Sequence, residues 1–451
     1  MKNFIIIFND DHGQWALPPY GNYDILSPNI NFLSANGITF LNSFTPTPVC
    51  SPARANFFTG LRTSDHGVHD FIGEPGKDKD WLSEFVTLPE ILQKDYSYKT
   101  SIFGKWHLGR DNEKKQYFDH WFVEVGQYPF THKMEHKFME NSNPQTIYGY
   151  RDQIITDHFI NWIKEYDASK PFFSFIGFNG THSPWEGHPK RLVEFYKNKK
   201  ITNKDQKNIL GMKQVLESET YRPQTNNDAS LEEYYASITH IDEKVGRILD
   251  ILEIKNLLEE TLIIYTSDHG LCCGQHGVWG KSNGTIPSNL FEESIRIPLI
   301  IFSGENLVRK KSNILVDHLD TYATIIDLVD ENYVLKDNYF GKSYKNYLFS
   351  LEEEDVFKEI QIIEYGNLIA LKNHEYKFIY DFSNNQKKLI NPTLDKSESN
   401  NLISKPEFDS IVNYFNSKLD EYLKSVLNSK YSVINYQEQI NISGVEPWID
   451  L

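Results

Sequence analysis

The sequence predicts an α/β fold: a large, mainly parallel β-sheet flanked by helices, followed by a smaller C-terminal antiparallel sheet with a helix. Continuous apolar runs that end in polar residues alternate with segments of helical periodicity, which is typical of a parallel sheet covered on both faces. After about Asn338 the pattern changes to short β-prone runs separated by Gly or Asn turns. Because 451 residues suit one large domain plus a smaller one, we expect a main domain over 1–340 and a C-terminal subdomain over 341–451.

Four apolar runs have the composition of strands that are buried on both faces of a parallel sheet. They occupy residues 4–8, 100–103, 171–178 and 262–266. Each is followed by polar or ionisable residues. Because ligands of open α/β sheets bind beyond the carboxyl ends of the strands, we expect these four ends to form one shared site. Two further β-prone runs occupy residues 38–44 and 297–302.

Helices are expected between these runs, where apolar residues recur at helical spacing. They occupy residues 88–94, 154–165, 231–255 and 318–329. Two polar stretches, 111–150 and 187–227, lack clear periodicity. We expect both to be long loops over the top of the sheet, where substrate-shaping loops tend to lie.

The C-terminal part is expected to contain an antiparallel meander and one helix. Three short β-prone runs at residues 359–363, 368–372 and 376–380 predict the meander, and apolar residues at helical spacing over 408–427 predict the helix. The last residues, 431–451, are expected to form a tail on the domain surface.

Composition and charge exclude several classes of protein. The formal net charge of −16 argues against binding nucleic acid over a broad face, although positive charge at one locus could still hold an anionic substrate. Three Cys residues give neither a disulfide framework nor zinc-ligand spacing, and no apolar run is long enough to span a membrane. The run at 4–8 is too short for a signal peptide. If Met1 is the natural start, we expect a cytoplasmic protein; if a signal was trimmed, a periplasmic or secreted one.

Cys50 is expected at the N-terminus of a helix. Pro52 suits the first turn of that helix, where its missing N–H is not needed, and Gly60 suits the far end as a C-cap. The free N–H groups and the dipole of a helix N-terminus favour an anion. A buried, unreactive thiol is the ordinary alternative for a lone Cys.

Three carboxylates at strand ends suggest a site for a hard cation. Asp10 and Asp11 are adjacent, and their repulsion is costly unless a cation lies between them. Together with Asp268 they offer hard oxygen donors, which suit Ca²⁺ or Mg²⁺ rather than zinc. Solvated carboxylates or a helix cap would be the alternative.

Five separate motifs give the chain a resemblance to a known family. Cys-Ser-Pro-Ala-Arg at residues 50–54 has the Cys-x-Pro-x-Arg pattern of the type I sulfatases, in which the Cys is oxidised to formylglycine. The other family-like motifs are Asp10-Asp11, Gly-Lys-Trp-His-Leu-Gly at 104–109, Thr-His-Ser-Pro-Trp at 181–185, and Asp-His-Gly at 268–270 followed by Lys281. They occur in the family's order, so the chain resembles a sulfatase of the alkaline-phosphatase-like superfamily.

The resemblance implies a metal site and a modified nucleophile. The metal ligands would be Asp10, Asp11, Cys50 as formylglycine, Asp268 and His269, with Ca²⁺ as the expected ion and Mg²⁺ as the alternative. His269 departs from the commoner Asn, but a neutral imidazole can still donate a lone pair to a metal. A formylglycine-generating maturation enzyme is implied as a partner. The oligomeric state is not predicted.

The resemblance also implies roles for basic side chains. Arg54 would hydrogen-bond the hydrated aldehyde and the metal-site carboxylates. Lys105 would contact the sulfate, and His107 would take a proton during elimination. His182 and Lys281 would contact the sulfate, and one of them would protonate the leaving oxygen. For a lone His or Lys, a core or surface role is the usual alternative.

The expected function is therefore hydrolysis of a sulfate ester, with a sulfated carbohydrate as the substrate class that the family suggests. Aryl sulfates and choline sulfate stay open. A phosphonate monoester or phosphodiester hydrolase with the same nucleophile is a second alternative, because tetrahedral phosphorus and sulfur anions are similar. A non-catalytic protein that binds a sulfated ligand is a remote third.

Overall fold

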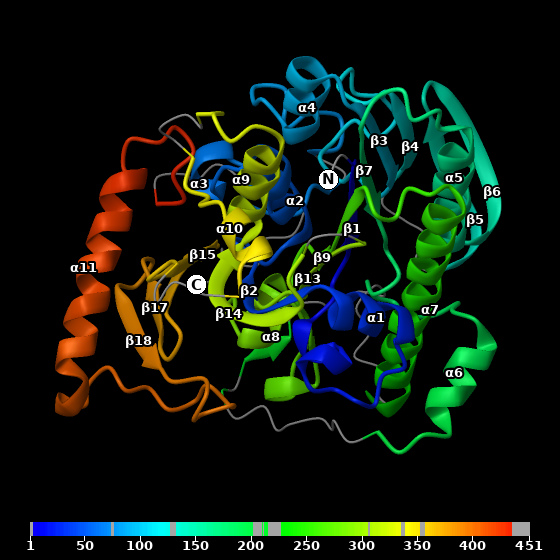
Figure 1. The fold of residues 1–451 in the computed structure, drawn as a ribbon. Coiled ribbons are helices and arrows are strands. Elements are labelled where there is room, and N and C mark those ends of the chain that lie inside the picture. The colour runs from blue at the N-terminus through cyan, green and yellow to red at the C-terminus, as the bar shows by residue number, and fades with distance from the viewer. Residues whose placement is uncertain are drawn as a thin grey trace.

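The structure is a computed structural model, and it describes residues 3–73, 76–126, 132–201, 210, 212–214, 227–304, 307–334, 339–351 and 357–434. Ten of its strands are β1 (Asn3–Asn9), β2 (Ile38–Phe44), β3 (Lys99–Gly104), β4 (His120–Glu124), β5 (Lys133–Glu140), β6 (Asn143–Tyr150), β7 (Phe172–Gly177), β9 (Thr261–Ser267), β13 (Leu299–Ser303) and β14 (Lys310–Asp317). Within the described ranges they form one sheet in the order β14-β2-β13-β9-β1-β7-β3-β4-β5-β6 (Figure 1). The central strands from β9 to β4 run parallel. The predicted mainly parallel sheet is confirmed.

Helices lie on both faces of this sheet (Figure 1). Their bounds are α1 (Pro28–Asn36), α2 (Cys50–Thr59), α3 (Thr63–His66), α4 (Leu88–Tyr96), α5 (Arg151–Glu165), α6 (Lys190–Lys197), α7 (Asn227–Ile254), α8 (Glu292–Ile295), α9 (His318–Val329), α10 (Lys345–Phe349) and α11 (Asp409–Val426). The short strands β8 (Lys213–Gln214), β10 (Cys272–Cys273), β11 (Trp279–Gly280) and β12 (Thr285–Ile286) pair outside the main sheet.

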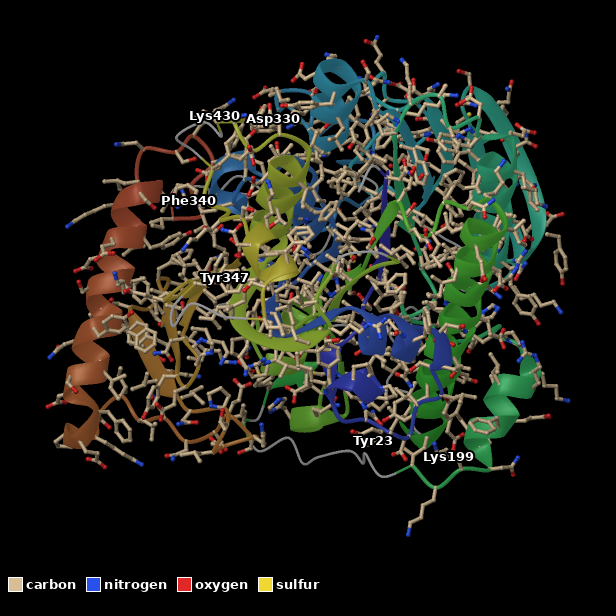
Figure 2. All side chains as sticks on the ribbon, viewed as in Figure 1. Tyr23, Lys199, Asp330, Phe340, Tyr347 and Lys430 are labelled. Carbon is tan, nitrogen blue, oxygen red and sulfur yellow. The ribbon has the colours of Figure 1, made fainter. Side chains whose placement is uncertain are left out.

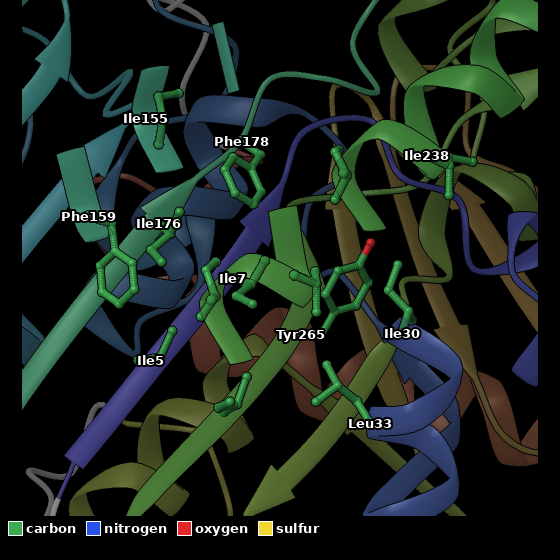
Figure 3. Close-up of a cluster of buried hydrophobic side chains, with 14 of the residues drawn as sticks. Ile5, Ile7, Ile30, Leu33, Ile155, Phe159, Ile176, Phe178, Ile238 and Tyr265 are labelled. Atoms are coloured by element: carbon green, nitrogen blue, oxygen red, sulfur yellow. The ribbon is translucent and has the colours of Figure 1, made fainter. Parts of the chain in front are cut away.

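Strand β1 shows how the core is divided between the two faces. Its side chains alternate, so Ile5 and Ile7 pack on one face with residues of α1, α5 and α7, as Figure 3 shows. Phe4 and Phe8 pack on the other face with residues of α2, α4 and α9. Because both faces are covered, the strand reads as one continuous apolar run in the sequence.

The C-terminal region forms the predicted meander and helix. Strands β15 (Gln361–Tyr365), β16 (Leu368–Lys372), β17 (Lys377–Asp381) and β18 (Gln386–Ile390) pair antiparallel in chain order. Helix α11 packs on one face, where the rings of Phe378 and Phe415 stack with centroids 5.6 Å apart. Figure 1 shows α11 at the outer side of this sheet. The boundary at residue 340 remains a prediction, and most of the expected tail at 431–451 lies outside the described residues.

The expectation of loops at 111–150 is wrong, because this stretch supplies β4, β5 and β6. In β5 only His136 and Phe138 are fully buried, and β6 is the last strand of the sheet. Polar and charged residues are common at an open sheet edge, and they hide the strand pattern in the sequence.

The expectation of a loop at 187–227 is also wrong where α6 lies, since Leu192 and Tyr196 bury one face of that helix. Just beyond α6, Lys199 donates to the backbone oxygen of Asp24 at 2.5 Å. Figure 2 shows Lys199 and Tyr23 at the same edge of the molecule. Residues 202–209, 211 and 215–226 are outside the described ranges. Among the described helices, none has both the length and the hydropathy needed to cross a bilayer.

Candidate active site

Cys50 is the first residue of α2, as the sequence predicts. No side chain caps the N-terminus of this helix, and the Cys50 side chain is almost fully buried. At the other end Gly60 has a φ of 68°, and a Cβ at this position would lie 2.5 Å from the ring of Tyr322. Only Gly fits this left-handed position against the ring, so the C-cap prediction is confirmed. The helix end therefore presents backbone N–H groups and a thiol at the same place.

Two neighbouring parallel strands bring their polar ends together. Asn9 of β1 pairs with Ser267 of β9, so Asp10–Asp11 and Asp268–His269 follow side by side. The backbone N–H of Asp11 donates to Asp268 Oδ1 at 3.1 Å, and that of His269 donates to the same oxygen at 2.8 Å. The strand ends predicted to share a site do so.

Lys281 and His269 contact the thiol directly. The Nζ of Lys281 donates to Cys50 Sγ at 2.9 Å and to Asp11 Oδ1 at 2.6 Å. The Nε2 of His269 lies 3.3 Å from Cys50 Sγ and 3.3 Å from Asp11 Oδ1. The sulfur thus contacts an ammonium and an imidazole that both also contact the Asp11 carboxylate.

Arg54 and Lys105 bind the carboxylates from another side. Arg54 is fully buried; its Nη2 lies 3.2 Å from Asp268 Oδ2 and its Nη1 donates to the backbone oxygen of Lys105 at 3.0 Å. The Nζ of Lys105 donates to Asp10 Oδ2. The residue before Lys105 is Gly104, which lies beside Gly177 of β7 at the end of β3. The two strands are so close here that a Cβ on Gly104 would lie 2.1 Å from the Gly177 oxygen.

The two predicted histidines also lie at the site, in different settings. His182 is partly exposed, and its Nε2 lies 3.9 Å from Asp11 Oδ2 while its Nδ1 donates to the Ser183 oxygen at 2.5 Å. His107 is buried, and its Nε2 donates to the Ile72 oxygen at 3.2 Å. The alternation of Lys105 and His107 in the sequence would fit an extended segment, but His107 has a φ of 61°, in the left-handed region.

Burial and charge shift the pKa values of the acidic groups in opposite directions. Burial alone would raise the pKa of Asp10, but Lys105, His182 and Arg54 outweigh it and hold the pKa well below its usual range. Asp11 behaves similarly, because Lys281, His182 and His269 outweigh burial and lower its pKa. Asp268 differs, since burial and the nearby Asp10 raise its pKa to about 6. Asp10 and Asp11 are thus the two carboxylates held in the charged form.

Four predicted ligands could share one cation. Single donor atoms of Asp10, Asp11, Cys50 and His269 all lie within 4.8 Å of one another. Asp10 Oδ1 and Asp11 Oδ2 are buried, and neither has a hydrogen bond within the described part of the chain. Two charged carboxylates with unbonded oxygens fit Ca²⁺ or Mg²⁺. In Asp268, by contrast, both carboxylate oxygens accept hydrogen bonds from the protein. Its role as a metal ligand stays a prediction.

Sequence reasoning missed two residues that support the site. The hydroxyl of Tyr234 donates to the Asp11 backbone oxygen at 3.1 Å, and His318 Nε2 donates to that of Asp268 at 3.2 Å. In the sequence, Tyr234 lies in the segment 231–255 and His318 in the segment 318–329, both of which are expected only to be helices. Their sequence patterns carry no signal beyond packing, because their partners are backbone atoms of distant segments.

Known proteins resemble this chain over most of its length. A sequence model of the family described as Sulfatase matches residues 2–331. An N-acetylglucosamine-6-O-sulfatase of Bacteroides thetaiotaomicron is 27% identical, and the match covers 66% of this chain and 62% of that relative. An ulvan-active sulfatase of Formosa agariphila is 24% identical, over 93% of this chain and 81% of the relative.

Solved structures show the same fold. A protein in complex with its substrate D-glucosamine-2-N,6-O-disulfate has a TM-score of 0.82 at 22% identity, covering 95% of this chain and 99% of the other. The phosphonate monoester hydrolase of Agrobacterium radiobacter has a TM-score of 0.73 at 18% identity, covering 94% and 96%. Because the family model spans most of the chain and the strand ends meet as the motifs require, the chain belongs to the sulfatase family, the type I branch of the alkaline-phosphatase-like superfamily.

Proposed function

We propose that this protein hydrolyses sulfate esters with a formylglycine derived from Cys50 and with a divalent cation, Ca²⁺ or Mg²⁺. One observation carries the proposal: Cys50 Sγ lies within 3.3 Å of Lys281 Nζ and His269 Nε2, beside two buried carboxylates that keep unbonded oxygens. A structural thiol needs none of these neighbours.

The basic side chains explain how a protein with a net charge of −16 can hold an anion. Lys105 contacts Asp10, Lys281 contacts Asp11, and the fully buried Arg54 contacts Asp268. Preorganised positive groups stabilise charge that spreads over the oxygens of a transferring sulfuryl group, as they do in phosphoryl transfer. We assign these three residues to the binding of the sulfate and the orientation of the nucleophile.

Formylglycine would supply an oxygen nucleophile at residue 50, and the cation would supply positive charge beside it. The donor set of Asp10, Asp11, residue 50 and His269 suits that cation, and we propose Asp268 as a further ligand. Cys50 is almost fully buried, so the maturation enzyme must oxidise it before α2 packs into the protein.

The hydrogen bonds of the two histidines show which ring nitrogen donates. The Ser183 oxygen can only accept, so His182 donates to it from Nδ1 and its Nε2 lies near Asp11. We propose that His182 protonates the leaving oxygen from Nε2, with Lys281 as the other candidate donor. His107 donates from Nε2 to Ile72, and burial and Lys105 keep its pKa well below the usual value. It is therefore a neutral acceptor at Nδ1.

A sulfated carbohydrate is the proposed substrate class. The relatives named for N-acetylglucosamine-6-O-sulfate and for ulvan support it, and so does the fold shared with a protein bound to a glucosamine disulfate. Aryl and choline sulfates are the alternatives within the same reaction. A phosphonate monoester or phosphodiester hydrolase is the second candidate, favoured by the structural likeness to the Agrobacterium radiobacter enzyme.

Product analysis separates these candidates. Purified protein is incubated with position-defined sulfated saccharides, an aryl sulfate, choline sulfate and a phosphonate monoester, and the released anion is identified. Sulfate release from a saccharide is the expected result, whereas a preference for the phosphonate ester would contradict the proposal. Mass spectrometry of the peptide that contains Cys50 tests the modification. An unmodified thiol in protein from a host with the maturation enzyme would favour a non-catalytic binding protein.

A further inference from the structure

A second polar pocket lies outside the active site, between α5, α6 and α7. Figure 1 shows these three helices on the same side of the main sheet. The cavity has a volume of about 580 Å³, and residues from all three helices line it. None of the proposed catalytic or metal-binding residues is among them.

Two helix N-termini meet at this pocket. Tyr150 is the N-cap residue of α5 and Pro189 that of α6, and both line the cavity. No side chain caps either helix. The N–H of Arg151 in α5 already donates to the His132 oxygen and that of Leu192 in α6 to the Pro189 oxygen, both at 2.8 Å. The dipoles of the two helices still favour negative charge at the same place.

One face of α7 adds a buried cation and a buried imidazole. His240 and Lys244, one helical turn apart, are 3% and 4% exposed and both line the cavity. The Nδ1 of His240 is buried and has no hydrogen bond within the described part of the chain. A buried polar atom of this kind indicates an absent partner, such as a ligand or an ordered water.

Among the described residues, Lys244 is less closely paired than the two arginines of the pocket, although Glu243, Asp152 and Asp157 all favour its charge. Arg191 lies 2.7 Å from each carboxylate oxygen of Glu243, whereas Lys244 Nζ is 4.0 Å from Glu243 Oε2. Arg247 is paired with Asp157 at 2.7 Å. Burial lowers the pKa of Lys244 to about 8, as expected for an ammonium that lacks sufficient negative charge nearby.

We propose that this pocket binds a second oxyanion of the sulfate class, held by the N-termini of α5 and α6 together with Lys244 and His240. The anion is either free inorganic sulfate or a further sulfate group on a saccharide whose other sulfate occupies the active site. Three packed and buried imidazole rings lie between the pocket and His182 of that site. His132 donates to the His182 oxygen at 3.4 Å, His188 stacks on His132 at 4.2 Å, and His240 contacts His188 at 5.7 Å between ring centroids.

The position of the anion can be found with selenate, a sulfate analogue whose selenium scatters anomalously. Crystals of the whole protein are soaked in selenate. We expect an anomalous peak within hydrogen-bonding distance of Lys244 Nζ, in addition to any peak at Cys50. A peak at Cys50 alone, or only adventitious ions on the surface, would overturn the proposal without affecting the proposed hydrolysis.

Calorimetric titration distinguishes the two sources of the anion. Wild type, Lys244→Met and His240→Gln are titrated with inorganic sulfate and with a disulfated saccharide, and Lys164→Met, at an exposed position of α5, is the control. Loss of a charge-assisted hydrogen bond should weaken binding about tenfold. If the pocket variants bind inorganic sulfate more weakly but the saccharide as tightly as wild type does, the pocket anion is free sulfate. If they bind both ligands more weakly, the pocket holds a sulfate group of the saccharide. Unchanged affinity for both ligands in both pocket variants refutes the proposal. As a control, the variants should hydrolyse a monosulfated ester at the wild-type rate, which shows that the active site is intact.

Discussion

Among the described residues, two of the buried groups of lysines and carboxylates differ in how closely each carboxylate oxygen is approached by a donor. At the junction with the C-terminal sheet, Lys377 is fully buried and its Nζ contacts Glu398 at 2.6 Å, Glu292 at 3.2 Å and the Leu290 oxygen at 2.7 Å. Lys372 adds a second ammonium 3.4 Å from Glu292. Each carboxylate oxygen of Glu292 and Glu398 thus lies within 3.2 Å of a nitrogen of the protein, as a structural role requires.

The cluster at the carboxyl ends of the main sheet is incomplete by comparison. Asp10 Oδ1 and Asp11 Oδ2 are buried without hydrogen bonds in the described residues, and Lys281 is shared between Asp11 and a thiol. Both clusters pair lysines with carboxylates, so the presence of such pairs alone does not separate them. The difference is whether the protein itself satisfies every charge, and this is what the predictions below test.

The largest effect is expected from Cys50→Ala, which removes the nucleophile. Sulfate release should fall at least about a thousandfold, because loss of a covalent catalyst leaves only binding and electrostatic contributions. The thermal midpoint should change little, since the side chain is small. Cys272→Ala, at a buried Cys in β10, is the control and should keep its activity within a few fold. Substantial turnover by Cys50→Ala would contradict the proposed mechanism.

Removal of divalent cations should also abolish activity and should lower stability. Without a cation, Asp10 and Asp11 repel each other in a buried site. Chelator treatment followed by gel filtration, activity assay and thermal unfolding checks this, and re-addition of Ca²⁺ or Mg²⁺ identifies the ion. If the chelated protein keeps full activity and the same unfolding temperature, the metal site is wrongly assigned.

Lys377→Met should damage stability rather than chemistry. Breaking a buried ion pair by removal of one partner costs about 3–5 kcal/mol of unfolding free energy, because Glu398 and Glu292 keep their charge or must bind protons. Denaturant unfolding measures the loss, and the kcat of the folded fraction should match that of wild type. Lys388→Met, at an exposed position of β18, is the control. A change in kcat without a change in stability would contradict the structural role of the Lys377 cluster.

The smallest effect concerns His276, which links the Lys281 segment to the C-terminal region. Its Nδ1 donates to the Ser397 oxygen at 3.2 Å and its Nε2 lies 2.8 Å from Glu293 Oε2. Burial opposes the charge on His276, but Glu293 outweighs it and raises the pKa. The contribution to stability is thus full below the unfolded pKa of about 6.5 and is lost as the pH rises through the folded value. Thermal unfolding of His276→Gln should differ from wild type more at pH 6 than at pH 9, and a constant difference would show that the imidazolium is not involved.

The core strands were predictable from their apolar runs, and so were the candidate site residues that directly follow the fully buried strands β1 and β9. Asp10 and Asp268 illustrate this, since the apolar run before each one fixes its place at the carboxyl edge of the sheet. Strand β5 was not predictable, because only alternate residues are buried at the edge. The role of Tyr234 was hidden because its partner is a backbone oxygen more than two hundred positions away.

The close approach of Gly104 and Gly177 makes two residues without any reactive group essential to catalytic geometry. A single methyl on Gly104 would collide with the backbone of β7, at the step in the chain just before Lys105. Any larger residue would push the two strands apart and move the Lys105 ammonium away from the Asp10 carboxylate. Enzyme engineers who diversify this region should therefore hold both glycines constant, however far from the chemistry they look in a sequence.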